Sequence, residues 1–159
     1  GFQPTADVSE ETGFSMGMGG IADIPSVGPI PRQFVTAFTA FPNLTTPVYA
    51  NGFPLLLFWP TGINTSRFEV IWFGLPHGES ALPEAWKQKI EAFNFILDED
   101  LTYLPSVQLS AESPAFRSIV LNYQERRIYH AHEQIDRVIG ADQIPERLRV
   151  QQVLAPFVE

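Results

Sequence analysis

The hydrophobic pattern between residues 32 and 74 predicts β-strands. Aromatic and β-branched side chains dominate residues 34–39 and recur at residues 48–49, and both kinds of side chain favour the half-buried surface of a sheet. Asn51-Gly52 is a turn signal, and the apolar run 53–59 follows it directly. These segments predict consecutive antiparallel strands.

A second long apolar run predicts the other half of a hairpin. Pro60-Thr61-Gly62 breaks the pattern, and residues 67–73 then form the next strand. The four apolar residues Val70-Ile71-Trp72-Phe73 are consecutive, which is typical of a strand buried on both faces.

A 3.6-residue periodicity predicts a long helix after the strands. It begins near Pro83, a favoured first-turn residue, and Glu84 lies beside the positive helix end. Pro105 is expected to end it. Its apolar residues fall in one stripe, which consists of Trp86, Ile90, Phe93, Leu97, Leu101 and Leu104.

A second helix is predicted by its end signals. Asn122 is followed three residues later by Glu125, which is the spacing of a capping box. Gly140 is a natural C-terminal stop. Residues 141–159 contain two prolines and predict a short helical turn with a closing tail or edge strand. The apolar stripe of this helix consists of Ile128, Ile135 and Ile139.

Strands followed by helices, without βαβ alternation, indicate an α+β fold with an antiparallel sheet. Residues 1–31 hold six of the 11 glycines, and they predict an irregular, acidic, Gly/Pro-rich arm. We expect residues 32–159 to form a single domain. An arm of this length is uncommon in a compact domain, so it suggests packing on a partner or a chain cut from something larger.

Composition excludes several classes of function. The net charge of −8 argues against nucleic acid and anionic membrane surfaces, because both are bound through Lys and Arg. Cysteine is absent, which excludes disulfides and a Cys-ligated iron–sulfur cluster in this chain. The chain has no apolar run long enough for a membrane span and no signal-peptide pattern, so we expect a cytoplasmic protein.

Asp98-Glu99-Asp100 is the most informative polar cluster. On the helical wheel Asp100 falls within the apolar stripe, whereas Asp98 and Glu99 lie off it. A carboxylate facing the interior needs a partner, a metal or a proton. Three interpretations remain open for Asp100: a metal-ligating or acid–base residue, an ion pair with an arginine, or a frayed helix end.

The three histidines give little sign of a metal site. His130 and His132 lie about 160° apart on the predicted helix, so they cannot bind one ion. His132 is expected in the core and His130 in solvent. His77 lies in a Pro/Gly loop. An ion-paired surface of the same helix is predicted from Arg126, Arg127 and Arg137 interleaved with Glu125, Glu133 and Asp136.

Several segments between Phe41 and Gly140 together resemble the catalytic domain of Rieske-type aromatic-ring-hydroxylating oxygenase α subunits. The helical sequence Asn122–Gly140 is similar to the C-terminal helix of that domain. Asp98–Leu101, followed by Gln108, is similar to the helix that carries the iron-ligating aspartate of the family. The segments that resemble its sheet are Phe41–Leu44, Pro60–Gly62 and Trp72-Phe73.

The resemblance implies a helix-grip fold, in which a curved antiparallel sheet wraps against a long C-terminal helix over an apolar cavity. It also implies a mononuclear Fe(II) held by two histidines and one carboxylate, and Asp100 matches the carboxylate. The cysteines of a Rieske cluster and the paired upstream histidines of the family have no counterpart in this sequence.

Two functions are therefore expected. In the first, the chain is a fragment or one half of a split oxygenase, and hydroxylates an aromatic ring only with a Rieske-containing partner chain. In the second, it is a stand-alone helix-grip protein that binds an apolar or aromatic small molecule without chemistry. A weaker third expectation is an interaction protein without a ligand cavity. Self-association into a homo-oligomer is also expected. The residues predicted to contact a ligand are Trp72, Phe93 and Leu97.

Overall fold

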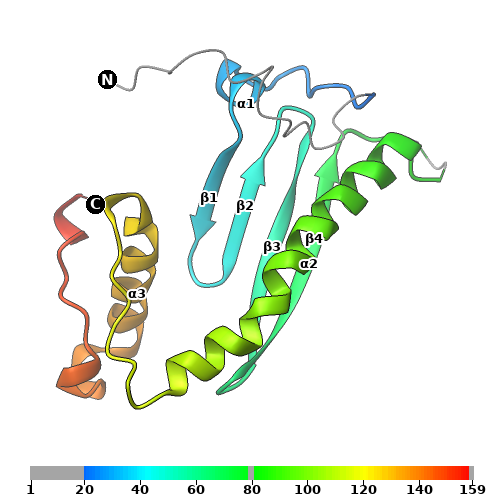
Figure 1. Ribbon diagram of the computed structural model, residues 1–159. Coiled ribbons are helices and arrows are strands. Elements are labelled where there is room, and N and C mark those ends of the chain that lie inside the picture. The colour runs from blue at the N-terminus through cyan, green and yellow to red at the C-terminus, as the bar shows by residue number, and fades with distance from the viewer. Residues whose placement is uncertain (1–19, 79–80, 158–159) are drawn as a thin grey trace.

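The computed structural model describes residues 20–78 and 81–157, in which a four-stranded antiparallel sheet is followed by two long helices (Figure 1). This arrangement confirms the predicted α+β class. The strands lie side by side in chain order, β1-β2-β3-β4. Their bounds are β1 Thr36–Ala40, β2 Leu44–Val48, β3 Gly52–Gly62 and β4 Thr65–Gly74. The helices are α1 Pro29–Gln33, α2 Glu84–Glu112 and α3 Arg126–Ile139.

Strands β3 and β4 form the predicted long hairpin, with Pro54 opposite Trp72. The predicted break at Pro60-Thr61-Gly62 is wrong, because β3 continues to Gly62. The register shifts between Pro60 and Gly62. A proline has no N–H to give to the ladder, and a local shift lets the strand pass it without ending.

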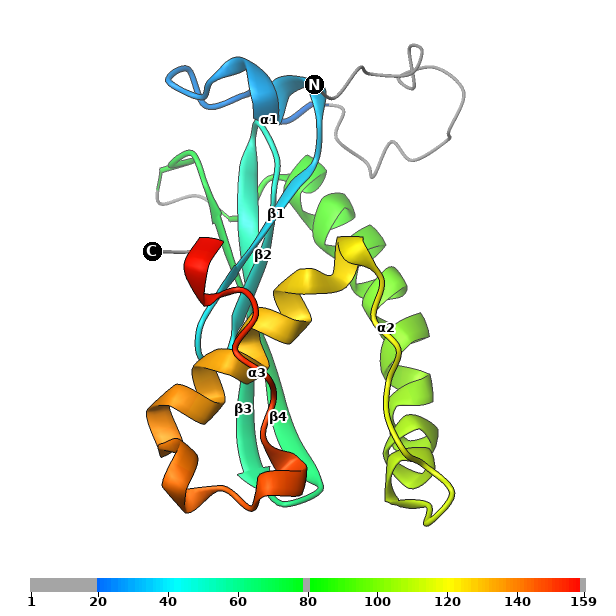
Figure 2. The same ribbon diagram turned by 90° about the vertical axis from the view of Figure 1, so that its left-hand side faces the viewer.

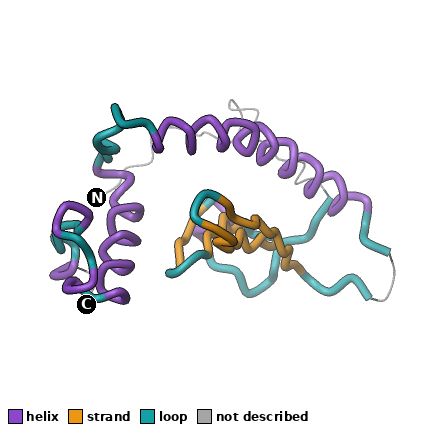
Figure 3. The backbone as a smooth tube through the Cα atoms, turned by 90° about the horizontal axis from the view of Figure 1, so that it is seen from below, coloured by secondary structure: helices purple, strands orange, loops and turns teal. Residues whose placement is uncertain are grey.

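Only one face of the β4 strand is covered by α2. Trp72 points to that helix, and its ring centroid lies 5.2 Å from that of Phe93. The prediction that β4 is buried on both faces is wrong, because Ile71 and Phe73 on the opposite face are 40% and 47% exposed. Figure 3 shows α2 passing over one side of the sheet. Consecutive side chains in a strand point to opposite faces, so a helix on one face buries only every second residue.

Helix α2 is longer than predicted, since it runs through Pro105 to Glu112. A proline inside a helix removes one hydrogen bond and costs about 3 kcal/mol, but the helix can resume after it. Gln108 donates to Glu112 across the next turn at 2.9 Å, and Ser110 donates to the carbonyl of Ser106. These local bonds support the last turns, and Pro105 is therefore not the helix end.

The apolar stripe of α2 is buried at one end and exposed at the other. Trp86 and Phe93 are buried, Leu97 and Leu101 are half-buried, and Leu104 is 51% exposed. The N-terminal half of the helix therefore packs on the sheet, and the C-terminal half extends beyond it. The predicted stripe is confirmed as a packing surface for the first half only.

Helix α3 ends where the sequence predicts, and the predicted capping box closes a 3₁₀ turn, Tyr123–Glu125, that leads directly into this helix. The Asn122 side chain accepts from the backbone N–H of Glu125, and the Glu125 carboxylate accepts from the Asn122 N–H, so the capping box is complete. Gly140 follows the helix with φ of 94°, which favours glycine. Figure 2 shows α3 on the side of the sheet where β1 turns into β2.

The C-terminal tail contains short 3₁₀ turns, and the edge strand considered for residues 141–159 does not form in the part that is described. Glu133 and Asp136 hold this tail against α3. The fully buried Glu133 accepts from the Leu154 N–H at 2.8 Å, and Asp136 accepts from the Val150 N–H at 2.8 Å.

The predicted N-terminal arm lies largely outside the described residues, since the description starts at residue 20. From there to Gly28 the backbone is irregular, and α1 then crosses the expected boundary between residues 31 and 32. Arg32 of α1 forms an ion pair with Asp23. No helix among the described residues is long and apolar enough to cross a membrane.

Candidate functional site

An aromatic cluster joins α2 to the sheet. Trp72 contacts both Trp86 and Phe93 edge to face, with centroid distances of 5.8 Å and 5.2 Å. Two of the three predicted ligand-contacting residues, Trp72 and Phe93, are thus brought together. The third, Leu97, lies one turn further along α2 and is half-buried. Trp72 also lines a cavity of about 400 Å³ with Trp86 and His77.

Two glycines make room for the Trp86 ring. A Cβ on Gly74 would lie 2.2 Å from Cζ2 of Trp86, and a Cβ on Gly52 would lie 2.8 Å from its Cη2. Gly52 also has φ of 143°, in the region that favours glycine. The ring therefore packs directly on backbone at the end of the sheet where β3 begins and β4 ends.

Lys89 lies in this cluster, although the sequence pattern did not indicate it. Its side chain is 1% exposed, and Nζ lies 4.6 Å from the ring centroid of Tyr49, 5.0 Å from Trp86 and 5.4 Å from Trp72. Nζ donates to Oδ1 of the buried Asn51 at 2.5 Å. The amine therefore ties α2 to the β2–β3 turn.

Burial shifts the pKa of both titratable groups in this cluster. Desolvation lowers the pKa of Lys89 to about 8 and raises the pKa of the Tyr49 hydroxyl to about 12. The sequence carried a signal for Lys89, because it lies three residues after Trp86 and four before Phe93. A lysine at the edge of an apolar stripe is a candidate for burial.

Asp100 lies on the part of α2 that extends beyond the sheet, and it is exposed together with Asp98 and Glu99. The described residues contain no group of three His, Cys, Asp or Glu side chains that could hold a metal ion. The donor set of the described chain therefore does not fit a complete mononuclear iron site. Asp100 offers one carboxylate, and the other ligands would have to come from elsewhere.

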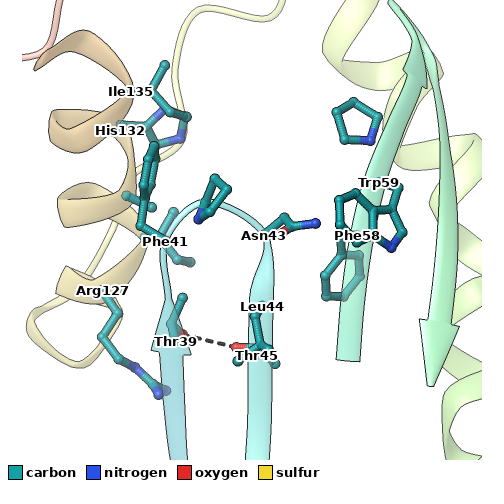
Figure 4. Close-up of a pocket in the computed structure, with 14 residues that line it drawn as sticks. Thr39, Phe41, Asn43, Leu44, Thr45, Phe58, Trp59, Arg127, His132 and Ile135 are labelled. Carbon is teal, nitrogen blue, oxygen red and sulfur yellow. Dashed lines mark hydrogen bonds between the residues drawn. The ribbon is translucent and has the colours of Figure 1, made fainter. Parts of the chain in front are cut away.

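A larger cavity lies between α3 and the tip of the β1–β2 hairpin, with a volume of about 830 Å³ (Figure 4). Its walls are mostly apolar. The β1–β2 turn contributes Phe41, the strands contribute Leu44, Phe58 and Trp59, and α3 contributes Ile128, Ala131 and Ile135.

Polar groups reach this cavity from both sides. Thr39 and Thr45 contact each other at 3.0 Å, and Arg127 Nη1 donates to the Ala37 carbonyl at 2.9 Å. The buried Nδ2 of Asn43 has no hydrogen-bond partner among the residues that the structure describes. A buried donor without a partner is costly to the fold.

His132 is exposed and lines the cavity, so its expected place in the core is wrong. Ile128 and Ile135 of the predicted α3 stripe line the cavity and are 48% and 41% exposed, whereas Ile139 does not line it and is 52% exposed. His130 was expected in solvent, but it is half-buried and bonds to Gln134 at 3.0 Å.

The predicted ion-paired surface of α3 is largely replaced by other contacts. In the described chain its paired charges are Arg137 and Glu133, 3.9 Å apart. Arg126 stacks on the Tyr123 ring at 4.3 Å, and Arg127 contacts β1 as above. The acids Glu133 and Asp136 accept from the C-terminal tail, which the sequence pattern did not indicate.

The comparison with known families decides where the chain belongs. Residues 11–141 match the family described as ring hydroxylating alpha subunit (catalytic domain). The chain belongs to this family. No curated protein and no solved structure matched the chain. The resemblance expected from the sequence is thereby confirmed.

In this member of the ring-hydroxylating α-subunit family, the matched region contains the whole described sheet together with α2 and α3. The aromatic cluster, Asp100 and the residues of the 830 Å³ cavity all lie within it. The region that matches the family is therefore the region that forms the candidate sites.

Proposed function

We propose that this chain supplies a sheet and a long helix to the catalytic domain of an oxygenase that hydroxylates an apolar aromatic compound. The family match over residues 11–141 is the observation that carries the proposal. Because the chain has no cysteine, the Rieske cluster would reside on another polypeptide or segment. The chain would act as part of a larger catalytic unit.

Asp100 would contribute one carboxylate to the iron of that unit, and the two histidines would come from the remaining part. Bound iron of this kind supplies oxygen activation. The exposed position of Asp100 on α2 supports this role, because a carboxylate there is accessible to a polypeptide that covers the helix. The interior of that catalytic unit would be apolar, and its apolar side chains would include Trp72, Phe93 and Leu97.

Co-expression with a Rieske-containing polypeptide tests this function. We expect a stable complex whose iron content, measured by plasma mass spectrometry, includes a mononuclear iron beyond the cluster. Asp100→Ala should lose that iron, whereas Asp98→Ala, a carboxylate on the same exposed turn, should keep it. The absence of a complex, or equal iron in both variants, contradicts the proposal.

A second function is favoured by the 830 Å³ cavity, whose size and apolar walls are typical of small-molecule sites. Here the chain would bind an apolar or aromatic compound without transforming it. Titration of the isolated chain with uncharged and charged aromatic compounds, followed by calorimetry, tests this function without a partner. Saturable binding supports it, and no binding across the panel contradicts it.

A further inference from the structure

We infer that two copies of this chain pair through the outer edge of β4, so that their sheets join into one continuous antiparallel sheet. The two β4 strands meet in the register that places Arg67 opposite the partner's Glu69. This assigns a surface to the homo-oligomer expected from the sequence. The pairing needs neither iron nor a Rieske-containing polypeptide, so it does not rest on the proposed function.

The outer edge of β4 is open to a further strand. β4 has ten residues and pairs with β3 on its inner side, and no strand lies on its outer side in the part of the chain that is described. Figure 2 shows α2 standing apart from the lower part of β4, near the β3–β4 turn. The opposite edge strand, β1, is partly covered, because its Ala37 carbonyl accepts from Arg127. An open strand edge is a template for pairing with another chain.

The hydrogen bonds of β3 decide which backbone groups of β4 point outward. The Phe58 N–H donates to the Asn43 carbonyl at 3.0 Å, so Phe58 bonds away from β4. Phe58 lies opposite Phe68 in the β3–β4 ladder. Antiparallel pairs alternate between bonded and non-bonded, so this pair is a non-bonded one. The N–H and C=O groups of Phe68 therefore point to the open edge, together with those of Ser66 and Val70.

The charges of β4 select one register for a second copy. The charged residues of this strand are Arg67 and Glu69, whose side chains are 68% and 45% exposed. A two-fold axis at Phe68 places each Arg67 opposite the partner's Glu69. An axis at Glu69 would bring the two carboxylates together, and an axis at Val70 would place both charges opposite apolar residues. Opposite charges across two strands stabilise the pair and like charges destabilise it.

Sedimentation velocity of the full chain over a range of concentrations tests the pairing. We expect a concentration-dependent dimer of twice the 17.8 kDa of one chain. Arg67→Glu and Glu69→Arg should each weaken dimerisation about tenfold or more, because each places like charges opposite one another. Lys87→Glu and Glu91→Arg make the same charge changes at exposed positions of α2 and should leave dimerisation unchanged.

An equimolar mixture of the two edge variants tests the register. In a mixed dimer, each substituted side chain faces the opposite charge on the other chain. The mixture should therefore dimerise at concentrations where neither variant does so alone. Mixing cannot restore the contact of 4.0 Å between Arg67 and Glu69 within one chain, so the recovery reports pairing between chains. It also shows that both variants fold.

Hydrogen exchange locates the interface on the strand. The amides of Phe68 and Val70 should exchange slowly in the dimer and rapidly in the dilute monomer, because only a second copy gives them an acceptor. The amide of Ile71 is the internal control. It lies opposite Leu55 in a bonded pair of the β3–β4 ladder, so it should be protected in both states.

A chain that stays monomeric at every concentration overturns the inference. A dimer in which the Phe68 and Val70 amides exchange rapidly also overturns it, since another surface then joins the copies. Edge variants that behave like their α2 controls, or a mixture that does not recover, contradict the register and with it the inference. Dimerisation that is lost in both edge variants and recovered by mixing them supports it.

Discussion

The amine of Lys89 lies among three aromatic rings, and its titration makes the free energy of unfolding depend on pH. Burial lowers its pKa from 10.5 to about 8, so between these values the unfolded chain holds a proton that the folded chain has released. The free energy of unfolding therefore rises with pH in this window. Tyr49 has the opposite effect above pH 10: its pKa is raised from 10.0 to about 12, so the free energy of unfolding falls as the pH rises through this range.

We expect the free energy of unfolding to increase by about 2 kcal/mol between pH 8 and pH 10, measured by urea denaturation. Lys89→Met should abolish this rise, because it removes the titrating amine. Lys87→Met is the control, since Lys87 is exposed on the same helix and pairs with Glu84 at 3.2 Å. A rise that persists in Lys89→Met contradicts the assignment.

A second prediction for a single residue concerns Gly74. Gly74→Ala should lower the free energy of unfolding by about 1–3 kcal/mol, because its Cβ would meet the Trp86 ring at 2.2 Å. Gly28→Ala is the matched control, since a Cβ there has nothing within 4 Å among the described atoms. Equal thermal midpoints for the two variants would show that Trp86 does not pack on Gly74.

Single residues were predictable where the helical wheel alone decides their position. The wheel placed Trp86 and Phe93 in a buried stripe, and both are buried. It placed Asp100 and His132 in apolar stripes as well, and both are exposed. The wheel gives the direction of a side chain, but burial also requires another element opposite that side chain, which the sequence does not state.

At the scale of elements, the Asn122 capping box closes the 3₁₀ turn Tyr123–Glu125 that leads into α3. Asn122 accepts from the N–H groups of Gln124 and Glu125 at 2.8 Å and 3.3 Å. Asn122→Ala should therefore lower the free energy of unfolding by about 1 kcal/mol, measured by urea denaturation with helix content followed by circular dichroism. Asn94→Ala, at an exposed position of α2, should cause no such loss. Equal effects would mean that the cap does not stabilise α3.

Elements with local signals were predicted well, and those governed by tertiary context were not. The ends of α3 follow from Asn122, Glu125 and Gly140, which act on their own neighbours. Pro60 and Pro105 are breakers in isolation, yet a strand and a helix pass through them. The cavity beside α3 was also not predictable, since the hairpin tip and the helix lie far apart in sequence.

For the whole molecule, the exposed apolar surface bears on the proposed function. The C-terminal half of α2 and the segment after it expose Tyr103, Val107, Leu109, Ile119 and Val120. Apolar side chains gathered along one stretch of a surface commonly mark a site of contact with another polypeptide. This supports the proposal that α2 is covered by a further part of an oxygenase catalytic domain.

The most direct test is the mass and composition of the native assembly. The protein would be immunoprecipitated from its source cells, and intact masses of every recovered species would be measured. The proposed function predicts a longer polypeptide that contains this sequence, or a stoichiometric partner that carries the cysteines and histidines of a Rieske protein. Recovery of a lone species of 17.8 kDa would contradict it.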